Sequence, residues 1–85
     1  MTKQHFIQLL GENQINEELV SFGPAYRDGY CIRKNHICWE VFVRERGQEY
    51  DLLGFPSESD ALQYLYGTLL RIYGTRSTGD GLREP

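Results

Sequence analysis

The chain has 85 residues, of which 40% are hydrophobic and 25% charged, and its formal net charge is -3. This length suits one domain with one core, and the composition excludes a disordered chain or a membrane-spanning one. The mild acidity disfavours nucleic acid as a partner, because binding to phosphates requires clustered lysine and arginine. The N-terminal segment MTKQHFIQLLGENQ lacks the apolar core and cleavage site of a signal peptide, so we expect a cytoplasmic protein.

Short helical segments are predicted at the start of the chain. Thr2 can cap a helix, and Gly11 suits the end of that helix. Its apolar residues, which recur at helical spacing, are Phe6, Ile7 and Leu10. Residues 13–23 mix apolar and polar side chains and predict one further helical turn, which stops before Pro24.

The centre of the chain predicts three antiparallel strands. Residues 26–34 alternate between apolar and polar, and residues 37–55 are rich in aromatic and β-branched side chains. Chain reversals at Lys34-Asn35 and Arg46-Gly47 give a meander. Its second hairpin then pairs Arg44 with Glu49, Val43 with Tyr50, Phe42 with Asp51 and Val41 with Leu52.

This register gives the sheet two different faces. The expected core face is apolar throughout and carries Tyr30, Ile32, Ile37, Trp39, Val41, Val43, Tyr50 and Leu52. The opposite face mixes charged and apolar side chains and carries Cys31, Arg33, Cys38, Glu40, Phe42, Arg44, Glu49, Asp51 and Leu53. Because only one face is continuously apolar, we expect both helices to pack on that face.

The C-terminal helix has the clearest pattern. Ser57 can serve as its N-cap, with Glu58 and Asp60 in the first turn, and Gly74 ends it. Its apolar stripe consists of Ala61, Leu62, Leu65, Leu69 and Ile72. Residues 75–85 are polar and are predicted to form a flexible tail. The fold prediction is therefore a single α+β domain over residues 1–74, of element order α-β-β-β-α, with a three-stranded antiparallel sheet.

The sequence offers no catalytic constellation. His5 and His36 lie in no recognisable motif, and a metal site built on Cys31, His36 and Cys38 would lack a fourth ligand. In the predicted register Cys31 lies opposite Cys38, which would allow a disulfide, but a reducing cytoplasm favours free thiols. We therefore predict no enzyme activity, no metal and no cofactor.

Three tyrosines of the last helix are candidates for binding a partner. The tyrosines of the last helix, Tyr64, Tyr66 and Tyr73, can be either partner anchors or packing residues.

The element order is also that of the double-stranded-RNA-binding domain. The acidic turn Ser57-Glu58-Ser59-Asp60, however, replaces the basic cluster that such a domain uses to bind phosphates.

The run from Cys38 to Leu70 resembles small bacterial immunity proteins, the cognate inhibitors of polymorphic or contact-dependent toxins. The resemblance is carried by Trp39-Glu40-Val41-Phe42, Glu45-Arg46-Gly47, Asp51-Leu52, Phe55, Ser57-Glu58, Ala61-Leu62 and Tyr64-Leu65. It implies a cytoplasmic protein without catalysis that binds and neutralises a toxin domain. A small adaptor or a self-associating interaction domain would have the same sequence features.

The predicted partner-binding surface is the mixed face of the sheet. It consists of Arg33, Glu40, Phe42, Arg44, Glu49, Asp51 and Leu53. Phe42 and Leu53 are expected to be exposed apolar anchors inside a ring of charges, as at the centre and rim of an interface. The acidic members favour a basic toxin. The turn around Glu58 and Asp60 is a competing contact site.

Overall fold

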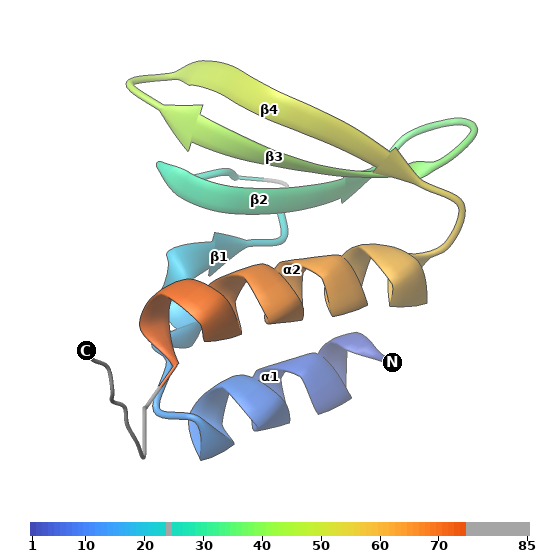
Figure 1. Ribbon diagram of the computed structural model, residues 1–85. Helices are drawn as coiled ribbons and strands as arrows, with labels where there is room; N and C mark the ends of the chain where they lie inside the picture. Colours follow the sequence, from blue (N-terminus) through green and yellow to red (C-terminus); the bar gives the residue numbers. More distant parts are fainter. Residues whose placement is uncertain (24, 75–85) are drawn as a thin grey trace.

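A computed structural model describes residues 1–23 and 25–74, and the predicted tail lies outside these residues. The elements in chain order are α1 (Lys3–Glu12), the 3-10 helix η1 (Glu17–Leu19), β1 (Val20–Ser21), β2 (Gly29–Lys34), β3 (Trp39–Glu45), β4 (Gln48–Phe55) and α2 (Glu58–Tyr73) (Figure 1). The predicted α+β class is confirmed.

The sheet has four strands in the order β1-β2-β3-β4, so the prediction of three antiparallel strands is wrong in detail. The additional strand, β1, has two residues and pairs with β2 in parallel, whereas the other pairs are antiparallel. Val20 and Ser21 belong to the segment that was predicted as a helical turn. A two-residue strand is too short to show an alternating pattern, which is why the sequence did not reveal it.

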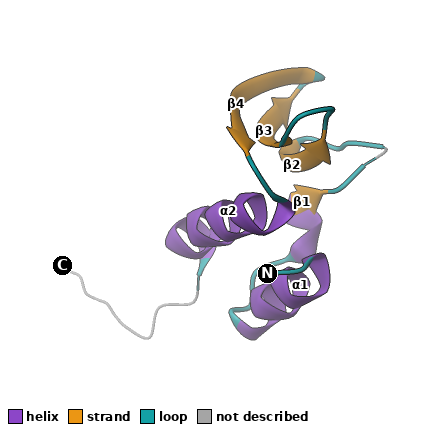
Figure 2. Cartoon of the chain, turned by 90° about the vertical axis from the view of Figure 1, so that its right-hand side faces the viewer, coloured by secondary structure: helices purple, strands orange, loops and turns teal. Residues whose placement is uncertain are grey.

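Both helices start at the predicted caps. The Thr2 hydroxyl accepts a hydrogen bond from the His5 amide at 3.1 Å, and the Ser57 hydroxyl accepts one from the Asp60 amide at 3.1 Å. The helices lie on one side of the sheet, as expected (Figures 1 and 2). The core between these layers contains Phe6, Leu10, Ile15, Val20, Ile32, Val41, Ala61, Leu62, Leu65 and Leu69. Ile72, the last member of the predicted stripe, is 53% exposed.

The first hairpin has a wider turn than predicted. Lys34 pairs with Trp39, and the Asn35 side chain accepts hydrogen bonds from the amides of Ile37 and Cys38 at 2.8 and 2.7 Å. This side-chain bonding stabilises a turn over residues 35–38 in place of the predicted reversal at Lys34-Asn35. Ile37 is therefore in the turn and 89% exposed rather than in the core. Cys31 pairs with Phe42 and not with Cys38.

The second hairpin follows the predicted register only near its turn. The pairs Arg44 with Glu49 and Val43 with Tyr50 are confirmed. Beyond them the register shifts, so that Val41 pairs with Leu53 instead of Leu52. Two residues of β4, Asp51 and Leu52, therefore oppose one residue of β3, which is a β-bulge. As a consequence Leu53 shares the helix-facing side of the sheet with Val41, and its predicted place on the opposite face is wrong.

Candidate functional site

A groove separates the β3–β4 hairpin from α2. The two elements are in contact at the base of the hairpin, where the rings of Phe55 and Tyr64 lie 5.2 Å apart. From this contact they diverge toward the hairpin turn (Figure 1). The resulting cavity of about 350 Å³ is lined from four elements: Tyr30 of β2, Val41, Phe42 and Val43 of β3, Asp51, Leu52 and Leu53 of β4, and Tyr64 and Thr68 of α2. We call it the tyrosine groove.

Large apolar side chains are exposed along the groove and next to it. Leu53 and Tyr64, which line it, are 42% and 41% exposed, and Tyr50 is 48% exposed. Tyr73, in the last turn of α2, is 48% exposed. Exposed apolar side chains that line a groove, as Leu53 and Tyr64 do, are a common feature of interaction sites. The β4 residues from Gln48 to Gly54 are all exposed, so this part of the hairpin is accessible to a partner.

Tyr30 connects the sheet to the groove. Burial is the main cause that raises its pKa, and the neighbouring Tyr73, Tyr64 and Asp51 add to the increase. Arg71 acts in the opposite direction. The Tyr30 hydroxyl thus stays protonated at neutral pH and can donate a hydrogen bond to a group placed in the groove.

The opposite face of the sheet, which we call the outer face, is held by an ion-pair network. Arg33 Nε donates to Glu40 at 2.7 Å, and its terminal nitrogens donate to Glu49 at 2.7 and 3.1 Å. The guanidinium lies 4.4 Å from the centroid of the Phe42 ring. These hydrogen bonds raise the pKa of Arg33, and the bond from Arg33 is the main cause that lowers the pKa of Glu40. The acceptor and donor groups of this network are thus already satisfied within the protein.

The loop before β2 packs onto the same face. Arg44 donates to the backbone carbonyl of Tyr26 at 2.8 Å and lies 3.5 Å from the Asp28 carboxylate. The Tyr26 ring contacts the Phe42 ring, with centroids 5.7 Å apart. Phe42 is consequently only 1% exposed. It is a buried packing residue, so the prediction that its side chain is exposed is wrong.

The predicted binding residues therefore divide between two surfaces. The structure brings Arg33, Glu40, Phe42, Arg44 and Glu49 together on the outer face. It places Asp51 and Leu53 at the tyrosine groove, which Phe42 also lines, although the Phe42 ring packs against Tyr26 and Arg33. The groove was missed because its strand residues were divided between the two predicted faces: Tyr30, Val41, Val43 and Leu52 were assigned to the core, and Asp51 and Leu53 to the opposite face. The tyrosines at those positions were a usable signal, since a tyrosine with an apolar ring and a polar tip suits a partly exposed site.

The tyrosines of α2 differ in their roles. Tyr64 lines the groove and Tyr73 is exposed, which keeps both as candidate partner anchors. Tyr66 is half-buried, and its hydroxyl accepts a hydrogen bond from the Asn13 side chain at 3.0 Å. This bond ties α2 to the end of α1, so Tyr66 is a packing residue.

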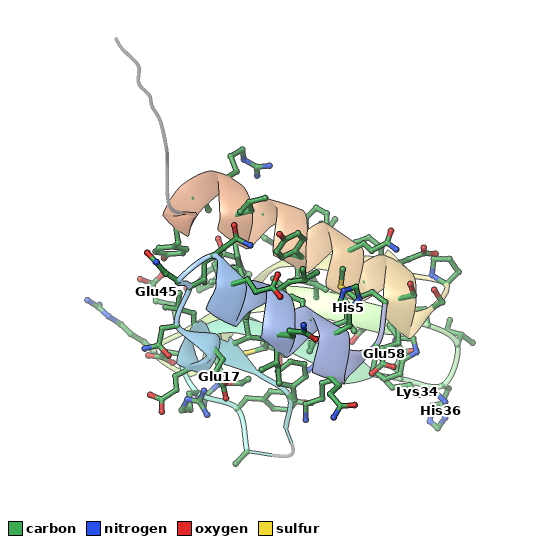
Figure 3. All side chains as sticks on the ribbon, turned by 90° about the horizontal axis from the view of Figure 1, so that it is seen from below. His5, Glu17, Lys34, His36, Glu45 and Glu58 are labelled. Atoms are coloured by element: carbon green, nitrogen blue, oxygen red, sulfur yellow. The ribbon has the colours of Figure 1, made fainter. Side chains whose placement is uncertain are left out.

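Groups with catalytic or metal-binding potential are scattered. His5 lies on α1 and His36 in the turn between β2 and β3, well apart from each other (Figure 3). Within residues 1–23 and 25–74, no three side chains of the His, Cys, Asp and Glu types converge as metal ligands. Cys31 is buried and Cys38 partly exposed, and neither is in a disulfide. No helix in the described part of the chain is long and apolar enough to cross a membrane.

Comparison of the chain with protein-family models, with curated proteins and with solved structures finds no match.

Proposed function

We propose that the protein neutralises a bacterial toxin by forming a stoichiometric complex with it, and that the tyrosine groove is part of the contact surface. The toxin as partner rests on the sequence resemblance to immunity proteins. The observation that supports binding through the groove is the exposure of Leu53 and Tyr64, two large side chains that line it. Tyrosine is enriched among the residues that dominate binding energy, because it buries a large ring at a small cost in conformational entropy.

The groove alone is smaller than a complete interface. A stable interface of standard size buries about 800 Å² on each partner. A toxin seated on the groove would therefore also cover exposed side chains at its ends, such as Ile72 and Tyr73. The outer face contributes less on this account, because its charges are paired and its phenylalanine is covered.

Co-expression with the toxin encoded beside the gene provides the test. The wild-type protein should restore growth and should co-purify with the toxin in a fixed ratio. The variant Leu53→Ser, Tyr64→Ser should lose protection while it remains folded. Ile37→Ser, which removes another exposed aliphatic side chain that does not line the groove, is the matched control and should protect fully. Failure of the wild-type protein to protect against or bind any such toxin would rule out the proposed function.

A second candidate is self-association through β4. This strand is at the edge of the sheet, and every residue from Gln48 to Gly54 is exposed. An uncovered edge offers backbone donors and acceptors to another strand. The molar mass of the wild-type protein and of Leu53→Ser in solution distinguishes the two candidates. A wild-type dimer that becomes a monomer in Leu53→Ser would favour self-association.

A further inference from the structure

We infer that the tyrosine groove recognises an arginine side chain of the partner protein, held between its tyrosine rings and the Asp51 carboxylate. This inference rests on the proposed use of the groove as a contact surface and adds the chemistry of the group that enters it. It is carried by three features of the groove: the backbone of Asp51, the lack of an ion pair to its carboxylate among residues 1–23 and 25–74, and the aromatic walls.

The backbone at Asp51 is unusual. Asp51 has a φ of +56°, and it is one of the two β4 residues in the bulge. Residues other than glycine adopt this left-handed region rarely, although aspartate and asparagine tolerate it better than most. Bulges occur often next to functional sites, where they redirect a side chain. Here the bulge places Asp51 at the wall of the groove and brings Leu53 to the same side.

Within the part of the chain that the structure describes, the Asp51 carboxylate forms no ion pair. Among residues 1–23 and 25–74, the ion pairs join Arg33 to Glu40 and Glu49, and Arg44 to Asp28, and no hydrogen bond reaches the Asp51 side chain. Asp51 is also the charged residue that lines the groove. Arg71, which acts to lower the pKa of Tyr30, neither lines the groove nor forms an ion pair with Asp51. An exposed carboxylate at the wall of a mainly apolar groove, unpaired among the described residues, therefore favours a cationic guest.

The walls select arginine among cations. Tyr30 and Tyr64 present aromatic rings, and Val43 and Leu53 present aliphatic surface for the methylene stem. A guanidinium is planar, stacks on aromatic rings and forms two parallel hydrogen bonds with a carboxylate. The outer face shows this combination within the protein itself, where Arg33 lies over the Phe42 ring and pairs with Glu49. A guest arginine would repeat that arrangement with Asp51 in place of Glu49.

Charge complementarity supports a basic partner as a whole. The chain carries a formal net charge of -3, so a basic toxin would be attracted to it before contact. The groove volume of about 350 Å³ is at the small end of the range for ligand sites, which suits one protruding side chain and its neighbours rather than a large ligand.

The test uses two short blocked peptides and does not need the toxin. One is acetyl-Leu-Arg-Leu-amide, and the other contains citrulline, the neutral isostere of arginine, at the central position. Each is titrated into ¹⁵N-labelled protein, and amide shifts are followed by NMR. We expect the arginine peptide to give saturable shifts at Val43, Asp51, Leu53 and Thr68, and the citrulline peptide to bind about tenfold more weakly. Equal binding of the two peptides, or shifts confined to other residues, would overturn the inference.

Two variants with the same charge change complete the experiment. Asp51→Asn removes the carboxylate but keeps a residue that tolerates positive φ, so the fold should be retained. Glu17→Gln removes an exposed charge on η1, outside the groove. The arginine peptide should lose about tenfold in affinity for Asp51→Asn and none for Glu17→Gln. If both variants lost the same affinity for the arginine peptide, the net charge of the protein would explain the loss, and the inference would be overturned. If the wild-type protein fails to protect cells from the toxin in the co-expression test, that result counts against the proposed function. It does not affect the outcome of the peptide titrations.

Discussion

Replacement of Phe42 by alanine separates the structure most sharply from the sequence-based expectation. An exposed phenylalanine can be removed at little cost, whereas Phe42 is 1% exposed and contacts both Tyr26 and Arg33. Removal of a buried phenylalanine costs about 3–5 kcal/mol, because the lost contacts leave a cavity. A domain of this size is stable by only about 4–11 kcal/mol, so Phe42→Ala should be unfolded in part or melt at a much lower temperature.

A milder variant measures the part of this loss of stability that comes from the contacts of the aromatic ring. Phe42→Leu keeps an apolar side chain but loses the ring contact with Tyr26 and the guanidinium contact with Arg33, which together are worth about 1–2.5 kcal/mol. Urea denaturation followed by circular dichroism measures both variants. Ile37→Ala, at a position that is 89% exposed, is the control and should stay within about 0.5 kcal/mol of wild type. A Phe42→Ala protein as stable as this control would refute the placement of Phe42 under the loop.

Further predictions concern acid stability, the bulge and the thiols. The hydrogen bond from Arg33 lowers the pKa of Glu40 below its ordinary value of 4.5. The ionised Glu40 therefore contributes its full stability above pH 4.5, and this contribution is lost as the pH falls through the lowered pKa. The stability difference between wild type and Glu40→Gln should therefore shrink below about pH 4.5 in denaturation curves, and a constant difference would contradict the ion pair. Because Asp51 has positive φ, Asp51→Val should destabilise the fold by about 1–2 kcal/mol and Asp51→Gly much less, whereas equal losses would argue against the bulge. Burial raises the pKa of the Cys31 thiol, so a thiol reagent should modify Cys38 quickly and Cys31 only after unfolding, and two equally fast thiols would contradict the burial.

The helices could be predicted because their signals are local. The caps Thr2 and Ser57 and the apolar spacing of α2 act within a few neighbouring residues, and both helices start where these signals place them. The sequence also allowed a correct prediction of which residues of β2 and β3 face the core. The wider turn at Asn35 shifts their pairing by an even number of residues, so Val41 still faces the core.

The bulge and the groove could not be predicted from the pattern. Regular alternation places Leu52 beside Val41, and only the extra residue at Asp51 brings Leu53 there instead. The covering of Phe42 depends on a loop folded across the outer face, which strand periodicity does not report. The binding surface was therefore predicted on the wrong side of the sheet for Leu53, while the role of either surface in binding stays a prediction.

The affinity of the complex tests the central claim most directly. Isothermal titration calorimetry would measure the dissociation constant for the toxin domain encoded beside the gene, with wild type, with Leu53→Ser, Tyr64→Ser and with Ile37→Ser. If the groove is the contact surface, the double variant should bind about thirtyfold more weakly or worse, and Ile37→Ser should bind as the wild type does. A folded double variant with unchanged affinity would contradict the claim that the tyrosine groove binds the toxin.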